Sequence, residues 1–173
     1  MSSPYPREVE TERLLLRPFR QSDFGVYAEM MADREVVRFL GEAEPAPRDV
    51  AWRHLAMLAG HWQLKGFGHW AVEIKQTGAF IGRVGLWFPE GWPDYEVGWV
   101  IARDAWGHGY AVEAARPALH HAFNTLDLRH VISLIIPGNV RSIRVSEKLG
   151  GRLERRAEFH GRETLFYAYD PAS

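Results

Sequence analysis

Residues 96–113 read Glu96-Val-Gly-Trp-Val-Ile-Ala-Arg-Asp-Ala-Trp-Gly-His-Gly-Tyr-Ala-Val-Glu113, and this is the most informative stretch of the sequence. Its first part is a strand-like run that ends near Ala102, and a helix begins directly after a short loop. The loop places Gly107 and Gly109 beside the first helical turn. The N–H groups of a first turn have no partner within the helix, the helix dipole adds positive charge there, and glycine lets the backbone approach an anion closely. The stretch therefore favours a phosphate site, although a plain tight turn would use the same two glycines.

Two common nucleotide-binding motifs are absent from the sequence. No G-x-x-x-x-G-K-[ST] run of a P-loop is present. A dinucleotide fingerprint would need Gly or Ala where this chain has Val112, and an acidic residue after a strand about twenty residues further on. Both motifs are therefore excluded.

Outward from this stretch, the hydrophobic pattern alternates between strand-like and helical segments. Strand-like runs lie at residues 13–19, 70–74, 79–87, 95–101, 131–136, 152–159 and 163–169. Helical patterns lie at residues 22–31, 33–40, 49–65, 107–124 and 139–149. The order β-α-α-α-β-β-β-α-β-α-β-β predicts an α/β (α+β) fold with a mixed sheet of six to seven strands and helices on both faces.

Length and composition narrow the class of protein. A chain of 173 residues predicts a single domain over residues 1–173, with a flexible segment at residues 1–10. With 21 Lys and Arg against 22 Asp and Glu, the formal charge of −1 provides no strong field for nucleic acid or an anionic membrane. The absence of cysteine excludes disulfides, thiolate nucleophiles and Cys-ligated zinc, and the N-terminal residues do not read as a signal peptide. We therefore expect a soluble, cytoplasmic protein.

The eight histidines do not form a metal-ligand pattern. No His-Glu-x-x-His motif exists, and the side chains of the adjacent His120 and His121 diverge by about 100° on a helix. The G-x-S-x-G motif of a serine hydrolase is also absent. We expect neither a metal site nor a hydrolase triad.

Four segments together resemble one enzyme family. Residues 106–111 read Trp106-Gly-His-Gly-Tyr-Ala111 and look like the acyl-coenzyme A pyrophosphate loop of the GNAT N-acetyltransferases. Residues 11–18, 33–41 and 139–150 resemble the opening strand, the early helix and the cofactor-lining late helix of the RimJ/RimL-type branch, whose members are ribosomal-protein-alanine acetyltransferase-like. The four segments lie in the expected order and span nearly the whole chain, so their agreement is far more specific than any single motif.

The resemblance implies a mostly antiparallel sheet that splays between its fourth and fifth strands and holds the pantetheine arm of acetyl-CoA in the gap. It also implies that backbone amides of the loop bind the pyrophosphate and that the fourth strand contacts pantetheine. Asn139 would bind the pantetheine amide, and it is also suited to cap the late helix. The cofactor-binding residues implied in this way are Val100, Ile101, Trp106, Gly107, His108, Gly109, Tyr110, Ala111, Asn139 and Ser142.

Two positions depart from the family pattern. Trp106 stands where many GNAT proteins carry Gln or Arg, so His108, Arg103 or Arg144 would help to meet the pyrophosphate charge. Ser146 stands where many carry a Tyr that is thought to protonate the departing thiolate. Serine is a weaker acid with a shorter reach. Ser146 is therefore a candidate catalytic acid, with a water or solvent as the alternative proton donor and an ordinary helix serine as the alternative role.

Acetyl transfer needs a neutral amine, and the sequence offers a carboxylate that can deprotonate it. Glu96 opens the strand that leads to the cofactor loop. In a regular strand Glu96, Gly98 and Val100 share one face, and a backbone N–H near Val100 can polarise the thioester carbonyl. A carboxylate with a raised pKa can take the proton of the amine. Glu96 is our candidate catalytic base, and a solvated carboxylate at a strand start is the alternative.

A loop rich in aromatic and acidic residues precedes Glu96. Trp92 and Asp94 lie in this loop, and aromatic faces beside carboxylates suit a cationic amine. We expect both residues on the rim of the acceptor site, with hairpin packing as the alternative. The pattern of the remaining sequence predicts core positions for Trp52, Trp62, Trp70 and Trp99.

These observations predict an acetyl-CoA-dependent N-acetyltransferase that moves an acetyl group directly to a primary amine in a ternary complex. The acceptor is open between a protein or peptide N-terminus and a small amine, because a fold does not determine a substrate. The missing Tyr keeps open a non-catalytic acyl-CoA-binding module of the same fold. We expect neither nucleic acid nor a membrane as a partner, and a homodimer is left open beside a monomer.

Overall fold

The computed structural model describes residues 5–41 and 43–171, and these contain an eight-stranded sheet in the order β1-β2-β3-β4-β5-β6-β8-β7. Every neighbouring pair is antiparallel except β5 and β6, which are parallel. The predicted mixed, mostly antiparallel sheet is therefore confirmed. Its strands are β1 (Val9–Glu10), β2 (Leu14–Arg17), β3 (His69–Ile74), β4 (Ala79–Trp87), β5 (Glu96–Ile101), β6 (Val131–Ile135), β7 (Arg152–Phe159) and β8 (Arg162–Tyr169).

The N-terminal segment is more ordered than its sequence suggests. The sheet has eight strands instead of the six to seven predicted. The strand that the sequence pattern missed is β1, whose two residues are too few for an alternating pattern to be recognised. Residues 5–10, expected to be flexible, instead lie against the sheet. The ring of Tyr5 is 1% exposed and stacks 5.0 Å from the ring of Trp70, whose Nε1 donates to the Pro6 carbonyl at 3.1 Å. Burial of this aromatic ring docks the segment, and residues 1–4 of the predicted flexible stretch lie outside the described residues.

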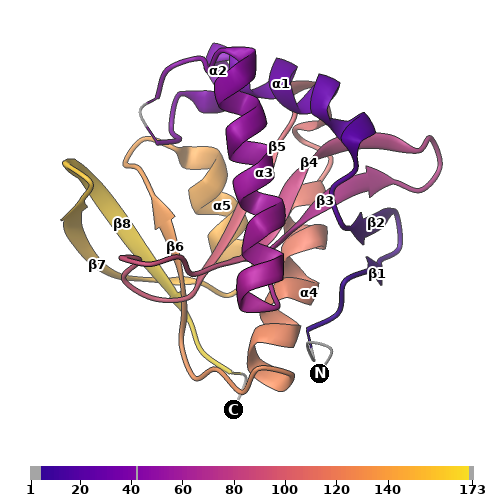
Figure 1. The fold of residues 1–173 in the computed structure, drawn as a ribbon. Coiled ribbons are helices and arrows are strands. Elements are labelled where there is room, and N and C mark those ends of the chain that lie inside the picture. The colour runs from indigo at the N-terminus through magenta and orange to yellow at the C-terminus, as the bar shows by residue number, and fades with distance from the viewer. Residues whose placement is uncertain (1–4, 42, 172–173) are drawn as a thin grey trace.

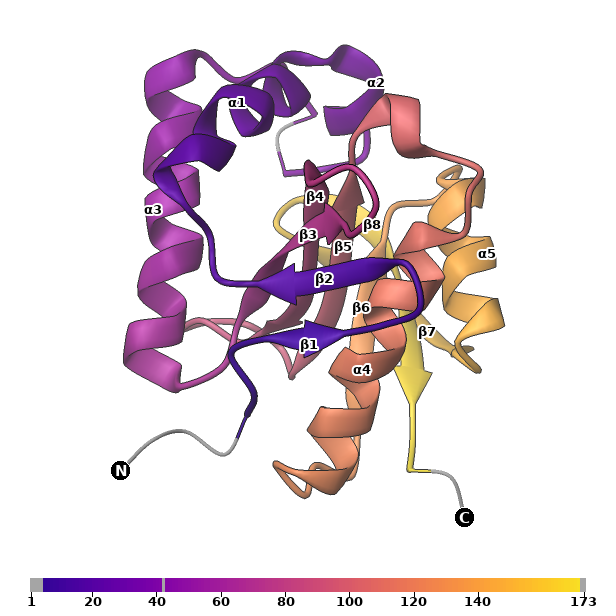
Figure 2. The same ribbon diagram turned by 90° about the vertical axis from the view of Figure 1, so that its right-hand side faces the viewer.

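Helices cover both faces of the sheet (Figure 1, Figure 2). The first three helices cover one face, where their side chains join a core cluster with Trp87 and Val100. The fourth covers the opposite face against Val84 and Val97, and the fifth lies beside it. The helices are α1 (Phe24–Ala32), α2 (Arg34–Val37), α3 (Arg48–Lys65), α4 (Tyr110–Asn124) and α5 (Val140–Lys148), with the short 3-10 turns η1 (Gln21–Asp23) and η2 (Arg103–Ala105). Within the described residues, no helix combines the length and apolar character needed to cross a membrane.

Two helices are shorter than their sequence patterns. The helix expected at residues 33–40 is only α2, which begins at the N-cap Asp33 and ends at Val37. The helix expected from residue 107 begins at Tyr110, because Gly107 and Gly109 have φ angles of 80° and 81° that no right-handed helix contains.

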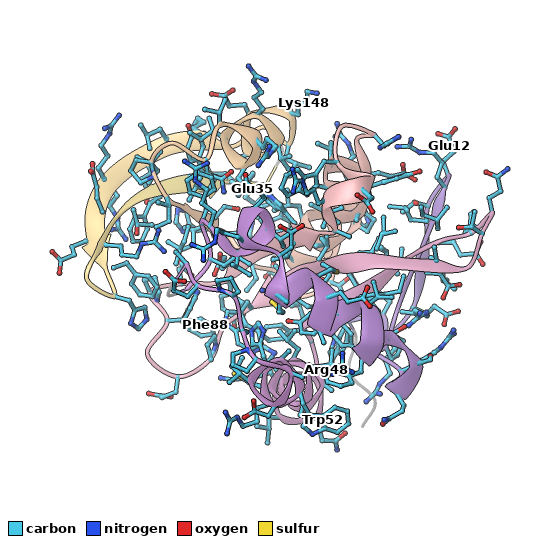
Figure 3. The ribbon with its side chains drawn as sticks, turned by 90° about the horizontal axis from the view of Figure 1, so that it is seen from above. Glu12, Glu35, Arg48, Trp52, Phe88 and Lys148 are labelled. Carbon is cyan, nitrogen blue, oxygen red and sulfur yellow. The ribbon has the colours of Figure 1, made fainter. Side chains whose placement is uncertain are left out.

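Trp52 does not occupy the predicted core position. Its side chain is 44% exposed on the outer side of α3, where it packs edge-to-face on Phe24 at 5.1 Å (Figure 3). Trp62 and Trp70 are buried as predicted, and Trp99 is half-buried. The prediction for Trp52 is wrong because the buried stripe of α3 runs one residue out of phase with it, through Ala51, Leu55, Leu58 and Trp62.

Strands β5 and β6 separate soon after they meet. Strand β4 pairs with β5 over six positions, whereas β5 and β6 are in register only at Glu96 and Ile132. The Val97 carbonyl still accepts a hydrogen bond from the Ser133 hydroxyl at 2.6 Å, and past this point the edge of β5 faces a gap. The splay predicted between the fourth and fifth strands of the sequence pattern is found here, between β5 and β6.

Candidate active site

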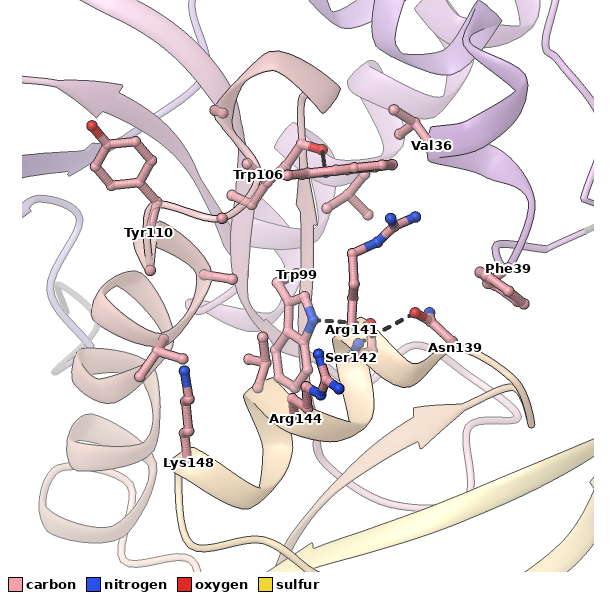
Figure 4. Close-up of a pocket in the computed structure, with 18 of the residues that line it drawn as sticks. Val36, Phe39, Trp99, Trp106, Tyr110, Asn139, Arg141, Ser142, Arg144 and Lys148 are labelled. Carbon is pink, nitrogen blue, oxygen red and sulfur yellow. Dashed lines mark hydrogen bonds between the residues drawn. The ribbon is translucent and has the colours of Figure 1, made fainter.

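A cavity of about 270 Å³ opens at the splay (Figure 4). Its walls come from β5, the turn before α4, the first turn of α4, helix α5 and helix α2. His108 is the predicted cofactor-binding residue that does not line it. The other predicted cofactor-binding residues all do, and these are Val100, Ile101, Trp106, Gly107, Gly109, Tyr110, Ala111, Asn139 and Ser142.

The turn before α4 presents backbone amides to this cavity. Gly107 and Gly109 are both left-handed, and a side chain at either position would be strained in this conformation. The first backbone bond of the helix runs from Glu113 N to the Gly109 carbonyl, so the amides of the first turn are left without a helical partner. The positive end of the helix dipole adds to this arrangement. The turn therefore has the geometry that an anion site on backbone amides needs.

His108 lies just outside the cavity lining. Its exposed ring has Nδ1 2.9 Å from the Trp106 carbonyl and stacks on the ring of Tyr110 at 5.6 Å. These contacts shape the turn from its outer side.

Three cations of α5 project into the cavity (Figure 4). They are Arg141, Arg144 and Lys148, and among the described residues none of them has a carboxylate oxygen within 4.0 Å. The guanidinium carbon of Arg141 lies 3.8 Å from the centre of the Trp106 ring. The positive charge that Trp106 cannot supply is thus available from α5. Of these three cations the sequence analysis named only Arg144, beside His108 and Arg103 from outside α5, although the three positions have the i, i+3, i+7 spacing of one helix face.

Asn139 and Ser142 serve the fold and still reach the cavity. Asn139 is the N-cap of α5, and its Oδ1 accepts from Ser142 N at 3.2 Å. The Ser142 hydroxyl accepts from Trp99 Nε1 at 3.3 Å. Both side chains line the cavity, so the capping role proposed as an alternative coexists with a ligand-facing position.

Backbone groups of β5 alternate between its two neighbours. The carbonyls of Val97 and Ile101 face away from β4, and Ile101 accepts from Trp106 Nε1 at 2.8 Å. Since successive residues of a strand point their backbone groups to opposite sides, the groups of Trp99 also face the gap, whereas those of Val100 face β4. We therefore assign the backbone contact expected at Val100 to Trp99.

The side chain of Glu96 lies on one face of β5, rather than along the strand edge that borders the gap. A Cβ added at Gly98 would lie 3.6 Å from Glu96 Oε1, and Val100 belongs to the cluster on this face, so the predicted alternation holds. Trp92 Nε1 donates to Glu96 Oε2 at 2.7 Å. Burial raises the pKa of Glu96 to about 7, against the opposing effects of the hydrogen bonds from Trp92 and from the Leu134 backbone and of the Arg83 charge. Glu96 is therefore half-buried, with Trp92 as a hydrogen-bond partner.

Comparison with known proteins identifies the family of this chain. Residues 13–152 match the family described as the acetyltransferase (GNAT) domain. The chain belongs to the GNAT acetyltransferase family. The predicted family resemblance is thus confirmed, and the general reaction of GNAT enzymes is N-acetyl transfer that depends on acetyl-CoA.

Three proteins illustrate the similarity of this GNAT chain to others. The acetyltransferase structure from Agrobacterium tumefaciens strain C58 is 33% identical with a TM-score of 0.84, and the match covers 94% of this chain and 93% of that one. The uncharacterized protein YkkB from Bacillus subtilis is 45% identical over 91 residues, which are 50% of this chain and 52% of YkkB, about half of that relative. Mycobacterium smegmatis RimJ, solved in complex with CoA-disulfide, shares the fold at 20% identity with a TM-score of 0.77, covering 99% of this chain and 90% of RimJ.

The two predicted acceptor-rim residues of the GNAT chain have different surroundings. Trp92 bonds Glu96 and packs edge-to-face on Phe159 at 5.1 Å, beside the tip of the β7–β8 hairpin. The Asp94 carboxylate instead accepts from Tyr95 N and lies 2.7 Å from Nδ1 of His130. Trp92 thus adjoins the candidate base, while Asp94 holds its loop to the start of β6.

Ser146 is completely buried and does not line the cavity. Its hydroxyl accepts from the Tyr169 hydroxyl at 2.7 Å, and Tyr169 also lies 3.1 Å from the Ser133 hydroxyl. Burial raises the pKa of Tyr169 above its usual value, which weakens it as an acid. In this GNAT chain the position of the missing Tyr is therefore part of a buried hydroxyl cluster under α5.

Proposed function

We propose that this GNAT domain transfers the acetyl group of acetyl-CoA directly to a primary amine while both substrates are bound. One observation carries the proposal: strand β5 borders the anion-binding cavity along its edge at Trp99 and Ile101 and presents Glu96 on its acceptor face. A single rigid strand can therefore hold a thioester and an amine in reacting orientation. Such orientation accounts for a large part of the rate of acyl transfer.

The donor side has the charge that a coenzyme A diphosphate needs. Backbone amides at the start of α4 suit the pyrophosphate oxygens, and Arg141, Arg144 and Lys148 add charge-assisted hydrogen bonds from the facing helix. Asn139 and Trp99 lie further along the gap, where they suit the amides of pantetheine. An anion at one end and an amide chain at the other fit acetyl-CoA.

The acceptor side can deprotonate an amine near neutral pH. With a pKa of about 7, Glu96 is partly ionised there and can take the proton of an ammonium group. The neutral amine nitrogen then attacks the thioester carbonyl carbon, the C–S bond breaks as coenzyme A leaves as a thiolate, and the nitrogen releases a second proton to solvent to become the neutral amide. We assign the proton that the thiolate takes up to solvent in the gap, because the Ser146 hydroxyl is buried in its own cluster.

The alternative of a non-catalytic acyl-CoA-binding module shares the donor side and differs at Glu96. The Glu96 carboxyl group, which accepts a hydrogen bond from Trp92 and whose pKa burial raises to about 7, favours the catalytic function, because perturbed pKa values cluster at functional sites. The acceptor class, a cytoplasmic location and the oligomeric state stay predictions from the sequence.

Glu96→Gln separates the two functions. Acetyl-CoA with micromolar affinity, added at a hundredfold excess, should stabilise wild type and variant alike by about 2.7 kcal/mol in a thermal-shift assay. Thioester consumption with a panel of protein N-termini and small amines should be measurable for wild type and fall about 10²–10⁴-fold in the variant. Equal turnover would remove Glu96 as the base, and stabilisation without turnover on any amine would favour the binding module.

A further inference from the structure

Arg83 of β4 is a positive charge on the acceptor face without an ionic partner. No carboxylate oxygen of the described residues lies within 4.0 Å of its guanidinium. Its Nη1 donates to His69 Nδ1 at 3.0 Å, and the Tyr27 hydroxyl is a second neutral partner. Its Nε is buried and has no hydrogen-bond partner within residues 5–41 and 43–171. Since a guanidinium is always charged, Arg83 keeps a full charge and an unused donor.

A second arginine on the same face shows how this fold neutralises a structural charge. Arg17 and Arg83 stand opposite Ala71 on its two sides, so the three side chains share one face of the sheet. Arg17 donates two hydrogen bonds of 2.8 Å to Asp23 and one of 2.7 Å to Glu73. A charge that leaves water without a partner costs free energy, and Arg83 has no such carboxylates beside it. The difference indicates that the anion for Arg83 comes from outside the chain.

Arg83 also stands beside the donor cavity. It pairs directly opposite Val100, which lines that cavity and belongs to the core cluster under the first three helices. The Cβ atoms of directly opposed strand residues are about 4.5–5.5 Å apart. Arg83 thus lies one strand away from the segment of β5 on which we propose that the thioester lies.

The polar groups of this face are not sealed by the helices above them. The side chains of Arg83, Glu96 and His54 are each half-buried, although Arg83 and Glu96 belong to central strands of the sheet. The apolar side chains of Trp87 and Val100 on the same face are 8% and 6% exposed. Solvent therefore reaches the charged groups while the apolar groups around them stay covered.

The charges around Arg83 favour a carboxylate as its ligand. Burial, and then the Arg83 charge, lowers the pKa of His69 and His54, and burial lowers that of His61, so these rings add no charge near neutral pH. One positive charge matches the single negative charge of a carboxylate, whereas a phosphate monoester carries about −1.5 to −2. A guanidinium also donates in the fork geometry that the two carboxylate oxygens accept.

We propose that Arg83 binds a carboxylate of the acceptor, so that the substrate is a primary amine with a carboxylate a few bonds from its nitrogen. The inference rests on the proposed function and narrows its acceptor. The short separation follows from the adjacent positions of Arg83 and Val100. A free amino acid and a peptide that begins with Asp both have it. The same charge repels an amine that carries no anion, so Arg83 also selects against simple polyamines.

Paired acceptors with and without the negative charge test Arg83. Each amino acid is compared with its own carboxamide, and a peptide that begins with Asp is compared with one that begins with Asn. We expect the ratio of kcat/KM for the charged acceptor over its uncharged counterpart to fall at least tenfold in Arg83→Gln. Arg53→Gln, which changes an exposed arginine of α3, should leave the ratio unchanged. The ratio is insensitive to a loss of activity that affects all acceptors alike.

The kind of pair that reacts best distinguishes a free amino acid from a peptide terminus as the source of the carboxylate. An equal loss for both members of every pair would mean that Arg83 is merely structural, and would overturn the proposal. A wild type that acetylates phosphoethanolamine in preference to every carboxylate-bearing amine would overturn it as well.

Binding to Arg83 can be measured without turnover. N-Acetylglycine and N-acetylaspartate have the carboxylate but no reactive amine, and N-acetylglycinamide lacks the charge. In NMR titrations of the coenzyme A-bound protein, the two acids should shift the Arg83 Nε–H resonance, which Arg83→Lys removes and so assigns, and the amide should not. The Arg17 Nε–H, already bonded to Glu73 at 2.7 Å, is the internal control.

The two measurements separate this inference from the proposed function. If neither acid shifts the Arg83 resonance, Arg83 is not a carboxylate site. A wild type that shows the shift but acetylates no amine would count against the proposed function alone.

Discussion

The carboxyl group of Glu96 links the stability of the fold to pH. Burial raises its pKa to about 7, above the ordinary 4.5, so the folded protein favours the protonated form. This contribution to stability is complete below about pH 4.5 and is lost as the pH rises through about 7. Glu96→Gln should therefore be more stable than wild type by about 1–3 kcal/mol at pH 8, and the difference should shrink toward zero near pH 4.5. Urea unfolding at the two pH values measures it.

Glu163→Gln is the matched control for this prediction. The Glu163 side chain is 62% exposed beside Arg156, so its replacement should change stability by less than about 1 kcal/mol at either pH. A Glu96→Gln variant that is less stable than wild type at pH 8 would contradict this prediction, because it would show that ionisation of the Glu96 carboxyl group does not lower the free energy of unfolding.

Individual residues also show what alternation in a sequence can reveal. The shared face of Glu96, Gly98 and Val100 was predictable because β4 and β5 pair without a register shift. The hydrogen-bond partner of Glu96 was not, since Trp92 reaches it from a loop. Nor did alternation locate Trp52, because two phases of helical spacing fit α3 and packing selects one of them.

At the scale of elements, α5 supplies the positive side of the cofactor cavity. Replacing either Arg141 or Lys148 by Ala should weaken acetyl-CoA binding about tenfold, because a hydrogen bond to a charged group contributes about 1.5 kcal/mol. The loss of affinity should be larger at low salt than at high salt, because salt screens the attraction that the replaced side chain contributes in the wild type. Calorimetric titration at two salt concentrations measures both effects.

Arg53→Ala provides the comparison for these variants. Arg53 is 70% exposed on α3 and pairs with Asp49 away from the cavity, so its removal should leave acetyl-CoA affinity unchanged. If Arg141→Ala and Lys148→Ala also bind like wild type, the diphosphate is held by the α4 amides alone.

Elements were easier to predict than their ends. The anion-binding turn could be predicted because its glycines precede a helical pattern, yet α4 begins at Tyr110, three residues later than expected, since two left-handed residues precede it. The cations of α5 could have been found from their spacing. Their direction could not, because the splay that exposes them arises from how β5 and β6 diverge.

At the scale of the whole molecule, a buried ion cluster ties the N-terminal half together. Arg17 of β2 donates two hydrogen bonds of 2.8 Å to Asp23 of η1, and its Nε donates to Glu73 of β3 at 2.7 Å. The side chains of Arg17 and Asp23 are both 3% exposed. The cluster therefore sets the start of α1 relative to the sheet, and with it the acceptor face of β5.

Asp23→Ala should leave the guanidinium of Arg17 buried with only Glu73 as an ionic partner. Breaking a buried pair from one side typically destabilises a fold by about 3–5 kcal/mol, and we expect a loss of this size in urea unfolding. Asp49→Ala, which breaks an exposed pair, should cost less than about 1 kcal/mol. Below the unfolding transition, Asp23→Ala should show a raised KM for the amine, because α1 packs on the acceptor face with Val100, and a smaller loss of acetyl-CoA affinity, because α2 follows α1 and forms one wall of the donor cavity. Loss of acetyl-CoA affinity in step with amine affinity would mean that the two halves of the site are coupled through the sheet.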